Sequence, residues 1–311
     1  MTIFRYAILS MLIISLWACK SDPKTETPSS ALVPATMTLS QLEANYAKEA
    51  NPTSGNALIV SIVDRLKDAS LKDTERISLL QKGYEVAKAQ GINARASGFL
   101  FSILKESNST PNPDQVFELG QLMKSGKKEA AANILFNSIL ENSPSWERIS
   151  EVKPQITETF SSSDAYIQSL GEALFQNVDN TGINRTAAMK YVNACEAYGL
   201  AYPGNTEKTP DYLFKAAEVA KSIRTFPKSL SIYDWILDKY PNYEKTPTSL
   251  FLKGFIIENN LKDDKMAKDI YNEFLSKYPK HDLADDVEFL IANLGKTDQE
   301  ILEMIESKKK K

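Results

Sequence analysis

Apolar residues recur at helical spacing along almost the whole chain. From Ser40 to Lys308, apolar side chains at i, i+3, i+4 and i+7 alternate with short breaks rich in Asn, Asp, Gly, Ser and Pro. No run shows the two-residue period of a strand, so the pattern predicts an all-α fold. Ser40-Gln41-Leu42-Glu43 has the form of a capping box at the first helix. The expected helices cover 40–49, 55–68, 73–89, 94–107, 114–125, 128–141, 145–159, 164–177, 184–201, 208–223, 227–239, 246–259, 264–277, 282–293 and 298–308.

The C-terminal third of the chain repeats itself. The dipeptide Tyr-Pro occurs at Tyr202-Pro203, Tyr240-Pro241 and Tyr278-Pro279, at a spacing of 38 residues. Between these dipeptides, Glu-Lys-Thr-Pro-x-x-Leu-Phe occurs at 207–214 and again at 244–251. Each unit holds two amphipathic helices, and the proline after the second helix forces the chain to turn. Stacked pairs of this kind form a helical solenoid.

The unit resembles the tetratricopeptide repeat (TPR), in which small residues let two helices approach and aromatic residues fill the space between pairs. That resemblance implies a right-handed α-solenoid of helix-turn-helix pairs. Residues 245–279 match with one extra residue in the turn, through Leu250, Gly254, Ile257, Ala267, Tyr271, Phe274 and Pro279. Three other segments follow the pattern, through Ala217, Ala220, Ser229, Tyr233, Ile236 and Pro241; through Gly120, Met123, Ala132, Phe136, Ile139 and Pro144; and, with one extra residue, through Gly83, Val86, Ala96, Leu100 and Ile103. A looser unit runs from Leu170-Gly171 to Pro203.

The resemblance also implies a binding groove lined by the first helix of each pair. The residues expected on its wall are Asp211, Phe214, Glu218, Phe251, Phe255 and Glu258. Phenylalanine rings flanked by carboxylates suit an amphipathic or a basic peptide. The alternative is that the rings cover the neighbouring helix and the carboxylates form a solvated face.

The first 19 residues have the pattern of a targeting segment. One charge, Arg5, precedes an apolar run over 7–18, which is short for a membrane span and suits a signal peptide. The ending Leu16-Trp17-Ala18-Cys19 resembles a bacterial lipobox, in which the cysteine receives lipid, including palmitate; the alternative is an ordinary secretory signal with an incidental Cys19. The expected organisation is a signal peptide at 1–18, a flexible tether at 19–37, an N-terminal helical region with degenerate repeats at 38–206, and C-terminal repeats with capping helices at 207–311.

Composition narrows the possible functions. The chain of 311 residues has 37 Lys plus Arg against 40 Asp plus Glu, so it lacks the basic field that nucleic-acid binding needs. One His and two Cys leave little material for a zinc site or a His-dependent triad. Because no phosphate-binding glycine loop or nucleophile motif is present either, we expect no enzyme activity, no metal site and no cofactor.

Together, the resemblances imply a membrane-anchored scaffold or adaptor lipoprotein of the bacterial cell envelope. Similar TPR lipoproteins serve in outer-membrane assembly or as envelope adaptors, so we expect a protein or peptide partner. Lys20 follows Cys19 where an aspartate would retain a lipoprotein in the inner membrane, and this favours the outer membrane, on its periplasmic face or at the cell surface. The alternative is a surface glycan-binding lipoprotein that works with a nutrient transporter. An enzyme would need a mechanism based on carboxylates alone.

Overall fold

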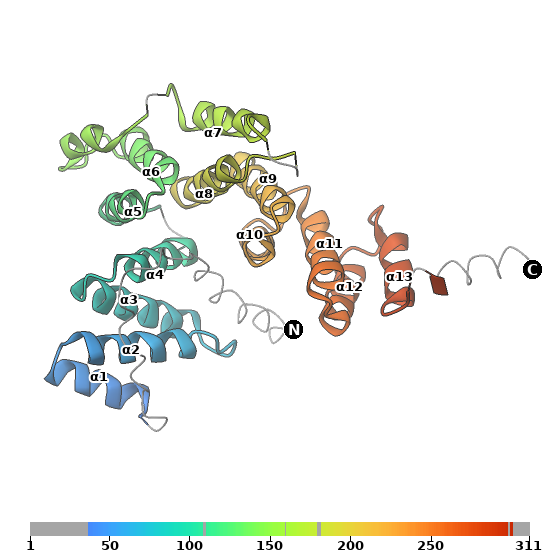
Figure 1. Cartoon of the computed structure of the whole chain (residues 1–311), viewed down its shortest axis with the longest axis horizontal. Coiled ribbons are helices and arrows are strands. Elements are labelled where there is room, and N and C mark those ends of the chain that lie inside the picture. Colours follow the sequence, from blue (N-terminus) through green and yellow to red (C-terminus); the bar gives the residue numbers. More distant parts are fainter. Residues whose placement is uncertain (1–36, 108–109, 159, 179–181, 298, 301–311) are drawn as a thin grey trace, which may run out of the picture. The chain divides into compact units, whose positions relative to one another are not determined.

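The structure is a computed structural model that describes residues 37–107, 110–158, 160–178, 182–297 and 299–300 (Figure 1). All regular secondary structure in these residues is helical, which confirms the predicted fold class. The predicted signal peptide, Cys19, the tether up to residue 36 and all but residues 299–300 of the helix predicted over 298–308 lie outside the described residues. In the described part, no helix combines the length and the apolar character needed to cross a membrane.

The chain divides into two compact units, Met1–Asn205 and Thr206–Lys311. The first unit contains α1 (Leu39–Lys48), α2 (Pro52–Arg65), α3 (Asp73–Ala89), α4 (Asn93–Glu106), α5 (Pro113–Ser125), α6 (Glu129–Asn142), the 3-10 turns η4 (Ile149–Glu151) and η5 (Lys153–Gln155), α7 (Ser163–Glu172), the 3-10 turn η6 (Ala173–Phe175) and α8 (Arg185–Ala201). The second unit contains α9 (Lys208–Ser222), α10 (Phe226–Lys239), α11 (Thr246–Ile256), the π-helical turn η7 (Ile257–Leu261), α12 (Asp264–Lys277) and α13 (Ala284–Asn293).

Within each unit, helices that follow each other in the sequence pack on each other, as a helical-repeat solenoid requires. Extensive contacts join α3 to α4, α5 to α6, and α9 to α10, and α11 packs on α12 in the same manner. We call the first member of such a pair the A helix and the second the B helix. In the first unit, α8 also packs on α6, and α7 packs mainly on α8.

The turn between the A and B helices has one recurring form. Its key residue has a positive φ, at Gly91 (67°), Lys127 (59°), Arg224 (58°) and Lys262 (58°). After the first three, the next backbone N–H donates to a carbonyl five residues earlier, as from Lys128 to Met123 (2.8 Å). This bond is typical of the Schellman ending of a helix. The extra residue predicted after Gly254 lies in the π turn η7, where the bond from Asp263 reaches back to Ile257 (3.2 Å).

The residue before each closing proline also has a constant geometry. Tyr202, Tyr240 and Tyr278 have φ of −128°, −127° and −131° and ψ of 51°, 55° and 51°. Ser143, before Pro144, has φ −139° and ψ 51°. A residue before proline is pushed out of the helical region, so the helices that these prolines follow, α6, α8, α10 and α12, end at the same point of their repeats.

Three predicted helices needed correction. The segment 145–159 is not one helix but the two short turns η4 and η5, because Pro154 has no N–H and its ring clashes with the carbonyl four residues earlier. The helix expected over 164–177 ends at Glu172 and continues only as η6. The first helix begins earlier than predicted, with a capping box between Thr38 and Gln41 in place of Ser40 and Glu43.

The tightest contact inside a helix pair joins a glycine of the A helix to an aromatic ring of the B helix. A Cβ atom placed on Gly120 would lie 2.5 Å from Phe136, and one placed on Gly254 would lie 2.6 Å from Tyr271. Gly83 meets Phe99 in the same way at 2.5 Å, at the same sequence spacing as Gly120 and Phe136, whereas the sequence pattern had placed Leu100 at this position. At these distances carbon atoms overlap, so only glycine allows the two helices to pack this closely.

Replacing Gly254 by alanine should therefore destabilise the fold. We expect overpacking against the buried Tyr271 ring to lower the free energy of unfolding by about 1–3 kcal/mol, although alanine by itself favours a helix by about 1 kcal/mol. The matched control is Gly204→Ala, since a Cβ atom there meets nothing within 4 Å. Urea unfolding followed by circular dichroism measures both; equal midpoints for the two variants would contradict the packing argument.

Candidate functional site

The A helices of the second unit present a phenylalanine at a constant position. Phe214, Phe251 and Phe289 each follow a buried residue at the helix start, Thr209, Thr246 or Ala284, by five residues. The sequence analysis predicted the first two and missed Phe289. The 38-residue Tyr-Pro spacing, carried one repeat further from Phe251, would have found it. We call the C-terminal wall the set Asp211, Phe214, Glu218, Phe251, Phe255, Glu258 and Phe289.

Asp211 holds two successive repeats together. Its Oδ1 atom accepts hydrogen bonds from the Tyr243 hydroxyl (3.1 Å) and from Lys245 Nζ (3.2 Å), and its Oδ2 atom lies 2.7 Å from Lys215 Nζ. The Lys245 ammonium also lies 5.4 Å from the centre of the Phe214 ring, within cation–π range. Acid, ring and base therefore form a clasp between α9 and the start of α11.

The first unit contains a clasp of the same composition. Arg148 Nη1 lies 3.4 Å from Asp114 Oδ1, and its guanidinium lies 4.9 Å from the centre of the Phe117 ring. In both units the ring follows the acid by three residues and the base follows the acid by 34 residues. The clasp is therefore a repeated structural device at the joint between repeats.

The glutamates of the C-terminal wall also bond within their own repeats. Glu218 accepts from the Tyr233 hydroxyl (2.5 Å) and from Lys221 (2.9 Å), and Glu258 accepts from the Tyr271 hydroxyl (2.6 Å). Burial raises the pKa of both tyrosines, and the carboxylates raise it further, so each phenol stays a protonated donor. The carboxylates of Asp211, Glu218 and Glu258 thus all accept hydrogen bonds from side chains of the same chain.

The boundary between the α11–α12 repeat and α13, which we call the third joint, has no clasp of this kind. The positions that correspond to Asp211 and Lys245 are held by Thr248 and Leu283, which carry no charge. The Phe251 ring packs against Tyr271 and Phe274, with centroids 6.4 and 6.5 Å away, and lies 6.1 Å from the Phe255 ring. Phe255 is 39% exposed and Phe289 is 47% exposed. The last repeat therefore offers solvent an aromatic surface.

A buried ion pair joins α11, the helix that carries Phe251 and Phe255, to α10. Lys253 Nζ of α11 lies 2.5 Å from Asp234 Oδ1 of α10, and the two side chains are only 4% and 11% exposed. Breaking a pair this deeply buried leaves an uncompensated charge, so it fixes how α11 sits on α10. Nothing in the sequence pattern had pointed to it.

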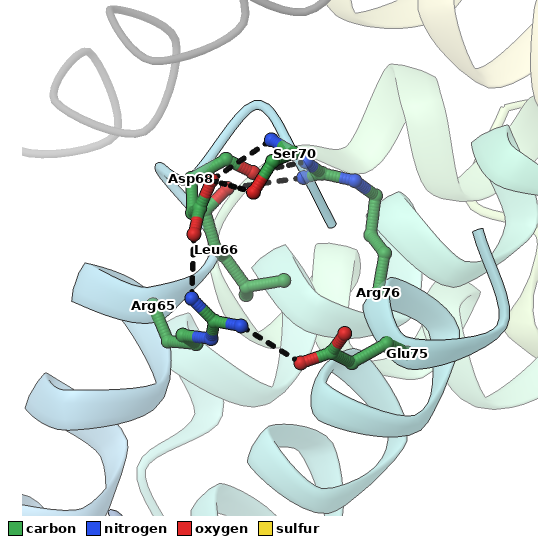
Figure 2. A network of polar contacts seen from close by, with 6 residues as sticks. All are labelled: Arg65, Leu66, Asp68, Ser70, Glu75 and Arg76. Atoms are coloured by element: carbon green, nitrogen blue, oxygen red, sulfur yellow. Dashed lines mark hydrogen bonds and ion pairs between the residues drawn. The ribbon is translucent and has the colours of Figure 1, made fainter. Parts of the chain in front are cut away.

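A polar network in the first unit has a structural role. Figure 2 shows Arg65 between Asp68 (2.5 Å) and Glu75 (3.0 Å), with the buried Arg76 reaching the loop that joins α2 to α3. Arg76 donates to the carbonyls of Leu66 (3.1 Å) and Asp68 (3.2 Å). The backbone N–H and the hydroxyl of Ser70 both donate to the Asp68 carboxylate. These hydrogen bonds fix the loop between α2 and α3, and the charged groups of Arg65, Asp68 and Arg76 bind partners within the chain.

The single histidine and an acidic residue at the start of α12 have structural contacts. His281 Nδ1 accepts from the Leu283 N–H (3.1 Å), and its ring lies 5.6 Å from Phe274. Asp263 caps α12 by accepting from the Met266 N–H (2.9 Å). Cys195 is buried in α8. Across the described ranges, no three His, Cys, Asp or Glu residues gather closely enough to hold a metal ion.

Comparison with known families identifies one of the repeats. Residues 248–281, which include most of α11, η7 and α12, match the model of the tetratricopeptide repeat. No curated protein sequence matches the chain. The chain thus contains a TPR repeat, a module that generally binds protein partners and typically serves as a scaffold without catalysis. The match lies on the repeat that exposes Phe255.

The clasp at Asp211 should make stability depend on acid pH. Burial alone would raise the pKa of Asp211, but hydrogen bonds and charge from Lys215 and Lys245 outweigh it and lower the pKa below its usual 3.8. A carboxyl whose pKa is lower in the folded state contributes stability above its unfolded pKa and loses it as pH falls through the folded pKa.

We expect Asp211→Asn to lower the free energy of unfolding at pH 7 by about 0.5–1 kcal/mol, a small value because the clasp is partly exposed and screened by solvent. The difference between the variant and the parent should shrink as pH falls toward the folded pKa of Asp211, which lies below 3.8, since the parent then loses the same contribution. Urea unfolding from pH 7 to 3 measures this, with Asp269→Asn, an exposed carboxylate of α12, as the control. A difference that is constant with pH would contradict the assignment.

Proposed function

We propose that the chain is a lipid-anchored scaffold or adaptor of the bacterial cell envelope, which binds a protein partner through its C-terminal wall. The observation that carries the binding part is the exposed aromatic surface at Phe255 and Phe289, on and beside the repeat that matches the TPR model. Exposed aromatic side chains are typical of protein-binding surfaces.

The anchoring part rests on the sequence of the first 20 residues. Arg5, the apolar run over 7–18 and Leu16-Trp17-Ala18-Cys19 stand in the order of a lipoprotein signal, and Cys19 is the residue we propose to be lipidated. Several acyl chains at one cysteine hold a protein on a membrane far more firmly than a single chain does. Lys20 favours the outer membrane, and the resemblance to envelope TPR lipoproteins favours outer-membrane assembly as the process served.

Replacement of Cys19 tests the anchor. We expect Cys19→Ala to abolish incorporation of labelled palmitate and to leave the chain uncleaved or in the soluble fraction, because no other residue near the signal can accept the lipid. Cys195→Ala is the matched control, since it removes the other cysteine of the chain from a buried helix. Label that persists in Cys19→Ala would refute the lipid site.

Purification from crosslinked cells tests the binding surface. The intact protein should retain a stoichiometric envelope protein, identified by mass spectrometry, and Phe255→Ser should reduce its recovery at least tenfold, the effect of losing one aromatic anchor. Val60→Ser is the matched control, since Val60 is a similarly exposed apolar residue of α2, outside the wall. Equal recovery with both variants would remove Phe255 from the binding surface.

A further inference from the structure

We propose that Phe175 and Val178, on an exposed turn that follows α7, insert into the lipid surface of the membrane that holds the chain. We call these two residues the membrane turn. This inference rests on the proposed function, because it takes the lipid on Cys19 as the anchor. It adds a second contact with the same bilayer, which sets how the first unit is oriented on the membrane.

The apolar side chains of the membrane turn are exposed to solvent. Phe175 is 71% exposed, more than any other large apolar side chain in the part of the chain that the structure describes, and Val178 is 46% exposed. Leu174, next to Phe175, is buried and holds the turn on the core. The sequence has no charge between Glu172 and Val178, and the next charge along the chain is Asp179. The turn therefore presents an apolar, uncharged contact.

Hydrogen bonds fix the base of this turn. Asn184, the N-cap residue of α8, donates its backbone N–H to the Leu174 carbonyl (2.9 Å) and its side-chain amide to the Gln176 carbonyl (3.1 Å). Asn177 has a φ of 50°, in the left-handed region that asparagine adopts more readily than most residues. The turn is thus tied to the start of α8, and its backbone holds Phe175 in an exposed position.

The small area of the membrane turn favours lipid over a protein as its occupant. A phenylalanine side chain buries about 150–250 Å², whereas a stable protein interface buries about 800 Å² on each partner. The exposed residues that precede the turn on α7, Gln168, Ser169 and Glu172, are polar, so the apolar surface does not continue along that helix. A contact with lipid needs no such area when the chain is already held on the bilayer.

The proposed anchor supplies the affinity that the turn lacks. Residues 20–36 separate Cys19 from the first described residue and span at most about 60 Å when fully extended, so an anchored chain keeps its first unit close to the bilayer. Attachment at Cys19 makes the second contact intramolecular, and weak contacts then form at a high effective concentration. Since even a single myristoyl chain binds membranes only marginally, one phenylalanine orients an anchored chain and does not anchor it.

Fluorescence quenching in vesicles tests the contact, with the lipid-bearing protein purified from cell envelopes. The vesicles consist of phosphatidylethanolamine and phosphatidylglycerol with bromine on their acyl chains, which quenches tryptophan that lies among the lipids. We expect the emission that Phe175→Trp adds to the parent to fall at least about twofold, because an interfacial side chain lies about 5–10 Å deep in the headgroup and acyl boundary. Emission added by Val60→Trp, a matched control on α2 that is 43% exposed, should not change.

A charge placed in the turn checks that insertion causes the quenching. Adding Val178→Asp to Phe175→Trp should restore the emission, since a charged side chain resists transfer into lipid. Both side chains are exposed, so circular dichroism should show the same helix content in the variants and the parent.

Flotation of the vesicles separates the contact from the anchor. Protein that floats with the vesicles but shows no quenching at 175 would overturn the membrane turn and leave the lipid anchor in place. Protein that does not float and carries no lipid by mass spectrometry would overturn the anchor, and the membrane turn with it. Equal quenching at 60 and 175 would also overturn the turn as a specific contact. A benzophenone amino acid at 175 that crosslinks to one envelope protein in cells, with no quenching in vesicles, would assign the turn to a protein partner instead.

Discussion

The close contact between an A-helix glycine and a B-helix aromatic ring is the constraint on which the rest of the repeat depends in the pairs α3–α4, α5–α6 and α11–α12. Gly254 allows Tyr271 to lie across α11, and the same Tyr271 then donates its hydroxyl to Glu258, one turn further along the A helix. In α9 and α10 the corresponding tyrosine, Tyr233, donates to Glu218, one residue after Ala217. One side chain thus fixes both the helix spacing and a hydrogen bond to the glutamate of the wall. Packing inside the pair and the polar groups on its surface are therefore coupled through the tyrosine.

The joints between repeats add a second level of order. The closing prolines fix where each B helix ends, and the clasps Asp114–Arg148 and Asp211–Lys245 tie the next helix or turn to the ring before it. The third joint keeps the backbone geometry at Tyr278 but has lost both charges. In the described part of the second unit, the clasp is missing at the joint where Phe255 and Phe289 stay exposed, and this is the structural reason to propose partner binding there.

Much of this fold could be predicted from the sequence, because helix periodicity, Pro-terminated units and small-to-aromatic spacing are local signals. The extra residue after Gly254 and the place of Tyr271 were found in this way. The failures had identifiable causes. Pro154 broke a helix whose apolar pattern continued past it, and Phe99 replaced Leu100 because both neighbours are apolar and only the packing decides which faces Gly83. The partners of Asp211, Glu218 and Lys253 are distant in sequence, so periodicity showed that these side chains stand on a helix and could not show what they bind.

The central claim is that the last repeat, at Phe255 and Phe289, contacts a protein in the cell. The most direct measurement is site-specific photocrosslinking in living cells, with a benzophenone amino acid placed in turn at 255, 289 and 60. Val60 is as exposed as the two phenylalanines but lies on α2, in the other unit. We expect one crosslinked envelope protein of constant mass from 255 and 289 and none from 60. Crosslinks of equal yield from all three positions, or from 60 alone, would contradict it.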